Sequence, residues 1–160
     1  MTAPDIASTC LFLLPCILLL LTWSDFERKI IPNSLNAAVA VLGAVRTAAL
    51  DGFLALTETV LQALLVAAVV WLFRRLYVLV RNQQGLGLGD VKLLAASTLW
   101  VGLAGIPIEL LCASLTALAA VAALHMIGYT MTRKSALPFG PFLAFGLLAS
   151  IAVQENGWLA

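Results

Sequence analysis

Charged residues are scarce in this 160-residue chain. They make up 11% of it, whereas hydrophobic residues make up 62%. A soluble domain typically carries about a quarter charged residues and about half apolar ones. A chain this short cannot bury so much apolar surface in one core. The composition therefore excludes an ordinary soluble domain and predicts a protein whose outer faces contact lipid.

Paired cysteines and a strong net charge are also missing. None of Cys10, Cys16 and Cys112 belongs to a Cys-x-x-Cys pair, so the sequence predicts neither a zinc site nor a disulfide framework. The net charge of +1 gives no bulk attraction to nucleic acid. No basic cluster precedes the first apolar stretch, so we expect no cleaved secretory signal. Without linkers or internal repeats, residues 1–160 are predicted to form a single membrane-embedded domain.

What the chain does contain is six apolar segments. They cover residues 6–23, 32–50, 54–73, 91–106, 108–131 and 139–153. Spanning a bilayer takes about 20 helical residues, so the fourth and sixth segments are short. Open sheets are excluded because unpaired backbone groups are too costly in hydrocarbon, and no segment alternates like a barrel strand. The segments predict an all-α fold, a polytopic membrane helical bundle of about six transmembrane helices.

The basic residues predict how these helices are oriented. If the N-terminus lies outside, eight of the nine lysines and arginines fall in inner loops, and Arg46 alone falls on the outer half. Cytoplasmic loops of membrane proteins carry such an excess of basic residues. We therefore expect a multi-pass protein of the cytoplasmic membrane with both termini outside the cytoplasm.

Two aspartates are predicted at the inner membrane face, on different helices. Asp25 follows the first apolar segment, and Asp90 begins the fourth. A carboxylate beside hydrocarbon is costly unless it is paired, hydrated or functional. Two close carboxyls share one proton, so the ionised one can activate water while the protonated one hydrogen-bonds a peptide carbonyl, without a metal. A structural explanation also exists, because Asp is a common N-cap and Asp25 can be an ordinary interfacial helix end.

Glycines and a lysine surround Asp90. Gly87 and Gly89 come just before it and allow close backbone approach and unusual dihedral angles where the helix begins. Lys92 follows two residues later. Its long side chain can extend to lipid phosphate, or its charge can tune the carboxylate pair.

Prolines mark two further inner segments. Pro32 fits the first turn of the helix that follows Asp25, and Asn33 or Ser34 is the candidate cap for that helix. Pro138, Gly140 and Pro141 predict a stiff, irregular segment at the membrane face. Its free backbone groups could pair with an extended substrate. An ordinary helix-breaking turn is the alternative explanation.

Together these three inner segments resemble the type IV prepilin peptidase family, the GxGD-type membrane aspartyl proteases. The matching residues are Asp25 with Ile31-Pro32-Asn33, then Gly87-Leu88-Gly89-Asp90-Val91-Lys92-Leu93, then Pro138-Phe139-Gly140-Pro141. A short glycine-aspartate motif arises easily by chance. Here all three segments occur in family order on the predicted cytoplasmic side, and the resemblance extends over nearly the whole chain.

The resemblance implies that Asp25 and Asp90 are the catalytic pair of an aspartic endopeptidase that uses no cofactor and no metal. It implies bacterial substrates, prepilin or pseudopilin precursors, with a basic leader inside the cell and an apolar helix in the membrane. Larger family members carry an N-terminal cytoplasmic region, often with Cys-x-x-Cys pairs, that is associated with N-methylation. This sequence shows neither feature, so we expect a peptidase without N-methyltransferase activity and assign it no S-adenosylmethionine.

Two functions of other classes stay open. Buried carboxylates and broken helices also occur in ion pathways, so a small transporter or proton-conducting protein is one alternative. The predicted position of the aspartates, at the membrane boundary rather than the midplane, speaks against it. A non-catalytic scaffold subunit of a pilus or secretion machine is the other, and it predicts function without either aspartate.

Overall fold

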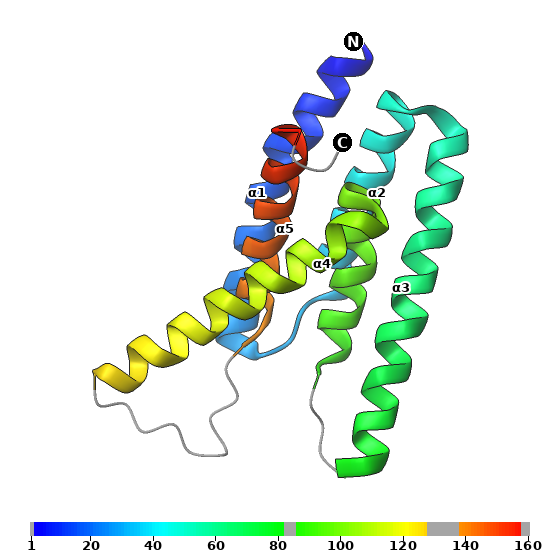
Figure 1. Ribbon diagram of the computed structural model, residues 1–160. Coiled ribbons are helices and arrows are strands. Elements are labelled where there is room, and N and C mark those ends of the chain that lie inside the picture. Colours follow the sequence, from blue (N-terminus) through cyan, green and yellow to red (C-terminus); the bar gives the residue numbers. More distant parts are fainter. Residues whose placement is uncertain (1, 82–85, 128–137, 158–160) are drawn as a thin grey trace.

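The protein is described by a computed structural model over residues 2–81, 86–127 and 138–157, and every regular element in these ranges is an α-helix (Figure 1). The helices are α1 (Ala3–Arg28), α2 (Asn33–Leu50), α3 (Gly52–Arg81), α4 (Leu88–Met126) and α5 (Gly140–Glu155). Among them, α1, α3 and α4 are long and apolar enough to cross a membrane, and α5 is a shorter apolar helix. The predicted all-α class is therefore confirmed.

The predicted count of six separate helices is not confirmed, because the fourth and fifth apolar segments belong to one element, α4. This helix bends at Gly102, where φ is 63° and ψ is −178°. Only glycine adopts such a conformation readily. The sequence placed the break at Pro107, but the helix continues through that residue. We call residues 88–101 the proximal arm and residues 103–126 the distal arm, and Figure 1 shows them diverging from the bend.

Side chains from neighbouring helices pair with the backbone groups that the bend releases. The pairs are Leu103 N to Gln62 Oε1 at 2.8 Å, Thr47 Oγ1 to Leu99 O at 2.9 Å, and Gln154 Nε2 to Val101 O at 2.7 Å. In an unbroken helix the Leu103 N–H would have donated to the Leu99 carbonyl. Broken helices occur at membrane depth only where such groups find other partners. These three contacts explain why the bend is stable.

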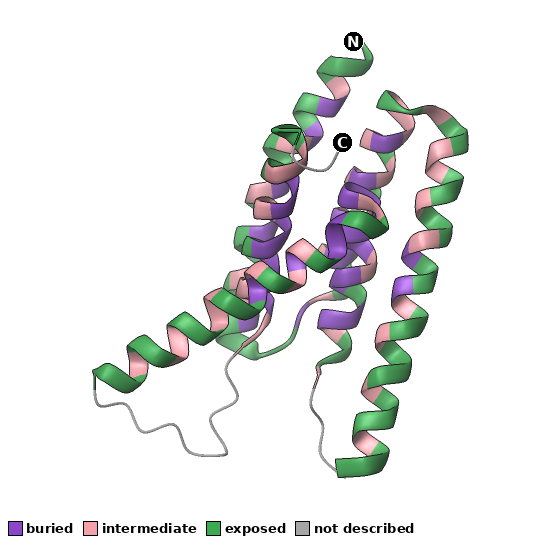
Figure 2. Ribbon diagram, in the orientation of Figure 1, coloured by how far each residue is buried: buried purple, intermediate pink, exposed green. Residues whose placement is uncertain are grey.

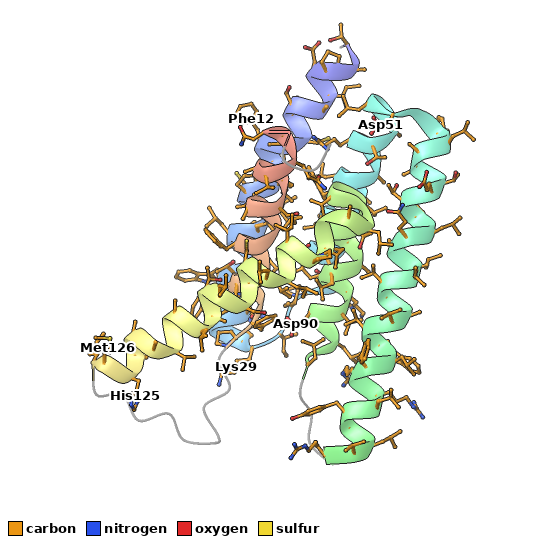
Figure 3. All side chains as sticks on the ribbon, viewed as in Figure 1. Phe12, Lys29, Asp51, Asp90, His125 and Met126 are labelled. Carbon is orange, nitrogen blue, oxygen red and sulfur yellow. The ribbon has the colours of Figure 1, made fainter. Side chains whose placement is uncertain are left out.

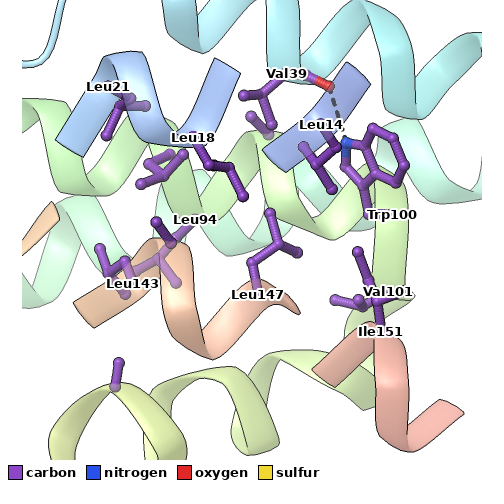
Figure 4. Packing of buried hydrophobic residues seen from close by; sticks show 14 of the residues in the cluster. Leu14, Leu18, Leu21, Val39, Leu94, Trp100, Val101, Leu143, Leu147 and Ile151 are labelled. Carbon is purple, nitrogen blue, oxygen red and sulfur yellow. Dashed lines mark hydrogen bonds between the residues drawn. The ribbon is translucent and has the colours of Figure 1, made fainter. Parts of the chain in front are cut away.

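Buried side chains from α1, α2, α4 and α5, with Val66 of α3, form one hydrophobic core (Figure 4). Its members include Leu14, Leu18 and Leu21 of α1, Leu94 of α4, and Leu143, Leu147 and Ile151 of α5. Their spacing along α1 and α5 places them on one helix face. At the edge of the core, Trp100 Nε1 donates to the Val39 carbonyl at 2.9 Å, which satisfies the buried indole N–H.

Helix α3 exposes most of its length. Only Ala63 and Val66 are buried in it, and Figure 2 shows exposed residues along its whole course. Large apolar side chains such as Leu61 and Phe73 are among them. In water, an apolar surface of this size would drive association, whereas in a bilayer lipid solvates it. The helix therefore fits the lipid-facing surface that the composition predicts.

The two ends of the bundle differ in charge. The end of α1, the end of α3 and the start of α4 lie together at one end, the lower end in Figure 1, which we call the basic end. It carries Arg28, Lys29, Arg74, Arg75, Arg81 and Lys92. The first residues of α1 and the end of α5 lie at the opposite end. Arg46, the one basic residue predicted on the outer half, lies there and pairs with Glu155 at 3.4 Å.

Candidate active site

Asp25 lies in the last turn of α1 and is buried, with 5% of its surface exposed. Its Oδ2 accepts the backbone N–H of Gly140 at 2.9 Å. Gly140 is the first residue of α5, and the first N–H groups of a helix have no partner inside the helix. The start of α5 therefore holds the Asp25 carboxylate, and the positive end of its dipole favours a negative charge there.

Asp90 lies in the first turn of α4 and is 9% exposed. Its Oδ2 accepts the backbone N–H of Gly87 at 3.2 Å. Gly87 is the N-cap residue, and Asp90 reaches back to it from the third helical position. Asp90 is thus not itself the N-cap, which was the structural explanation that its position in the sequence allowed. Each of the two carboxylates accepts a main-chain N–H at the start of a helix.

Both carboxylates line one cavity of about 380 Å³ at the basic end. The other lining residues are Lys29, Ile30, Ile31, Pro32 and Asn33 after α1, and Gly87, Leu88, Gly89 and Lys92 around the start of α4. Asp25 lies close enough for its charge to act on Asp90. Figure 3 shows Lys29 and Asp90 at this end of the bundle and Asp51 at the opposite end. The two aspartates that the sequence predicts at the inner face therefore line one cavity.

Two glycines let the backbone segments around this cavity come close together. A Cβ on Gly89 would lie 2.9 Å from Cβ of Ile31, and a Cβ on Gly140 would lie 2.6 Å from Oδ2 of Asp25. Close approach is thus confirmed for Gly89. Unusual dihedral angles are not, because neither Gly87 nor Gly89 has a positive φ.

Two hydrogen bonds join the start of α2 to the start of α4. Lys92 Nζ donates to Asn33 Oδ1 at 2.8 Å, and Asn36 Nδ2 donates to the Gly89 carbonyl at 3.3 Å. The expected roles at α2 are corrected by this geometry. Pro32 is the N-cap rather than a residue of the first turn, and Asn33 bonds Lys92 instead of capping the helix.

Asn36 is the residue of this site that the sequence interpretation missed. It is buried together with Val39, Gly43 and Thr47 on one stripe of α2. A polar residue at helical spacing on a core-facing stripe was the signal that could have identified it.

The segment around Pro138 is more regular than predicted. Pro138 precedes α5, but Gly140 and Pro141 lie in its first turn. Proline is tolerated there because the N–H that it lacks would have had no helical partner. The Gly140 N–H already donates to Asp25, so it is not a free backbone group that could pair with an extended substrate. The rest of the predicted loop, residues 128–137, lies outside the described residues.

Within the described ranges, no group of three or more His, Cys, Asp or Glu side chains is arranged to hold a metal ion. The chemistry that the described residues themselves offer is acid-base chemistry by two carboxyl groups. Two carboxyl groups that lie close together do not both ionise easily, so one of them can hold a proton while the other is ionised.

Comparison with known proteins points to one family. The model of the type IV leader peptidase family matches residues 12–123, which include both aspartates. The prepilin leader peptidase/N-methyltransferase of Aeromonas hydrophila is 32% identical over 162 residues, covering 99% of this chain and 50% of that protein. The protein of the same name from Escherichia coli K12 is 34% identical over 153 residues, covering 91% of this chain and 64% of that protein.

The chain thus spans about half the length of the curated relatives it matches. No solved structure matches it. The family match covers more than half of the chain and contains the cavity with its two carboxylates. This chain belongs to the type IV leader peptidase family.

Proposed function

We propose that this chain is an aspartic endopeptidase that removes the leader peptide from prepilin-like or pseudopilin precursors at the cytoplasmic face of the bacterial inner membrane. The observation that carries the proposal is the pair Asp25 and Asp90, which come from two helices and line one cavity at the basic end. The relatives named as prepilin leader peptidases support the choice of substrate.

The reaction consumes one water for each peptide bond. The ionised carboxylate takes a proton from water, and the water oxygen attacks the carbonyl carbon of the scissile bond. The protonated carboxyl gives its proton to the carbonyl oxygen, which forms a tetrahedral intermediate. The carbon–nitrogen bond then breaks, the leaving nitrogen takes the proton that came from water, and the carbonyl oxygen returns its own. The pair is left with one proton, as it began.

The main-chain hydrogen bonds at the site hold the two carboxylates in position. With Oδ2 of each carboxylate held by Gly140 or Gly87, we assign Oδ1 of each to the water and the peptide carbonyl. Positioning of this kind contributes strongly to rate, because a misplacement of about 1 Å can cost about 100-fold.

We further propose that the chain forms one membrane domain and crosses the bilayer six times, with both termini outside the cytoplasm. The basic end then faces the cytoplasm, in agreement with the excess of basic residues there. The two arms of α4 count as separate crossings, because the distal arm returns to the basic end, where Figure 3 places His125 and Met126. The proximal arm is shorter than the roughly 20 residues of a full crossing, so we place the Gly102 bend within the outer leaflet.

The test is cleavage of a prepilin from Aeromonas hydrophila, co-expressed with this chain or with its variants, followed on a gel and by mass spectrometry. We expect Asp25→Asn and Asp90→Asn each to lower the cleavage rate at least about 100-fold, since each removes one acid or base of the pair. Asp51→Asn is the matched control, because Asp51 is exposed at the opposite end of the bundle. Full processing by either active-site variant would contradict the proposal and leave the scaffold alternative.

The relatives are named for two activities, and we propose that the part matched here carries the peptidase one. The family model that matches residues 12–123 is named for leader peptidases alone. Incubating the purified chain with labelled S-adenosylmethionine and a processed pilin should therefore transfer no label. Label incorporated at the new N-terminus would show that this part also methylates.

A further inference from the structure

A second hollow, of about 340 Å³, lies between α2 and the proximal arm of α4. Four alanines form its apolar part, Ala37 and Ala40 of α2 with Ala95 and Ala96 of α4. Asn33 and Lys92 line both this groove and the cavity of the two aspartates. The groove therefore adjoins the candidate active site, and the hydrogen bond between Lys92 and Asn33 lies where the two meet.

The groove runs from the active site into the depth of the bundle. Both of its helices begin at the basic end, so residue numbers that rise from 33 to 40 and from 92 to 96 lead away from that end. A peptide bond held between the two aspartates would leave the cavity along this path on one side. An occupant of the groove would thus run parallel to α2 and to the proximal arm.

Asn36 supplies an independent sign of an occupant. It lines the groove and is 5% exposed. Its Nδ2 is engaged by the Gly89 carbonyl, but its Oδ1 has no hydrogen-bond partner within the described residues. Buried polar atoms in native proteins are almost always paired. The first turn of a helix offers the complementary groups, because its N–H groups lack partners inside the helix.

We propose that this groove binds the apolar membrane helix of the precursor, on the C-terminal side of the scissile bond, with the first turn of that helix at Asn36. The inference rests on the proposed peptidase function and adds the surface that holds the substrate. Alanine walls allow two helices to approach closely in a membrane, where close packing drives association. The direction of the groove matches a helix that enters the bilayer from the cytoplasmic side.

The experiment measures how far the apolar helix of the substrate improves cleavage. Two substrates are compared in detergent: the full-length prepilin of Aeromonas hydrophila, and a short peptide that spans its cleavage site but lacks the apolar helix. The quantity is the ratio of kcat/KM for the full-length precursor to kcat/KM for the peptide. Ala37→Trp fills the groove, and Ala68→Trp on the exposed face of α3 is the matched control.

We expect Ala37→Trp to lower this ratio at least tenfold, mainly through a higher KM for the full-length precursor. Ala68→Trp should leave the ratio as in the unaltered chain. Equal ratios in all three proteins would overturn the groove assignment. If the unaltered chain cleaves neither substrate, the proposed function itself fails, so the two failures are distinct.

A second measurement covers the case in which Ala37→Trp does not fold. A photo-crosslinking amino acid at position 40, in a chain that also carries Asp90→Asn, should crosslink to the apolar helix of bound full-length prepilin. The same amino acid at position 68 should not. Crosslinks at position 40 to lipid alone would show that an acyl chain fills the groove and would overturn the proposal.

Discussion

The two ends of the proximal arm of α4 are built from similar parts but serve different purposes. Near each end, a glycine lies close to polar side chains that bond main-chain groups. At the Gly102 end, Gln62 and Gln154 pair with backbone groups that the bend releases. At the other end, Asp25 and Asp90 accept main-chain N–H groups and also line a cavity.

The two ends differ in whether their polar side chains have a role beyond hydrogen bonding to the main chain. The side-chain amides of Gln62 and Gln154 complete the hydrogen bonding of the broken helix. Backbone groups inside a bilayer need such partners because no water is there to replace them. The carboxylates are held by the main chain, and in the proposed function they also act on the substrate. We therefore expect changes at the bend to alter stability, and changes at the aspartates to alter rate in protein that is still folded.

The largest effect outside the aspartates themselves is expected for Gly140→Ala. The new Cβ would lie 2.6 Å from Oδ2 of Asp25, so the carboxylate must move. A displacement of about 1 Å at a reacting group lowers the rate about 100-fold. The measurement is the rate of prepilin cleavage per folded molecule, with folding followed by thermal unfolding in detergent.

Gly146→Ala is the matched control on the same helix. Its Cβ would lie close to the main-chain oxygen of Glu109, away from the cavity. We expect a lower melting temperature but nearly normal cleavage per folded molecule. Equal losses of rate in Gly140→Ala and Gly146→Ala would mean that the contact with Asp25 has no special role.

The contact of Gly140 with Asp25 also shows where prediction from the sequence ends. The positions of the basic residues and three short motifs placed both aspartates at one face of an all-helical bundle. The hydrogen bond joins residues far apart in the chain, so no local pattern encodes it. Proline next to glycine predicted an irregular segment, whereas tertiary packing began a helix there.

The bend in α4 was missed for a related reason. Pro107 is the residue that local rules identify as a helix breaker, and the predicted break was placed there. The actual bend at Gly102 depends on partners in α2, α3 and α5 for the freed backbone groups. Because other helices stabilise this bend, the sequence of α4 itself indicates it only weakly, through the single glycine at position 102.

The second prediction concerns Gly102→Ala. A residue with a Cβ is strained at φ 63° and ψ −178°, and this costs about 1–3 kcal/mol of folding free energy. We expect a lower melting temperature in detergent, with cleavage per folded molecule close to normal. If Gly102→Ala lowered the cleavage rate without lowering stability, the expectation that the bend governs stability and the aspartates govern rate would be wrong.

Gln154→Leu should have a smaller effect at the same bend. It leaves the Val101 carbonyl without the donor that lies 2.7 Å away, and because Gln154 is only partly buried we expect a loss of about 1 kcal/mol. Denaturant titration in detergent measures it. Gln154→Glu, which keeps the shape but not the donor, should destabilise the protein at least as much, and normal stability of both variants would show that the carbonyl has another partner.

The smallest effect is expected for Glu155→Gln, which removes the ion pair with Arg46 at the end of the bundle far from the aspartates. The pair is 3.4 Å long, and the Glu155 side chain is 51% exposed, so water and salt screen it. Exposed pairs contribute about 1 kcal/mol or less.

Arg46 also lies over the ring of Trp100 in the proximal arm, at 5.9 Å from its centroid, and that contact survives in Glu155→Gln. Arg46→Met loses both contacts and should therefore lower stability more than Glu155→Gln, with the excess insensitive to salt. If the two variants were equally stable at high salt, the contact of Arg46 with the Trp100 ring would contribute nothing to stability. The polar contacts that stabilise this end would then be only those made with backbone groups at the bend.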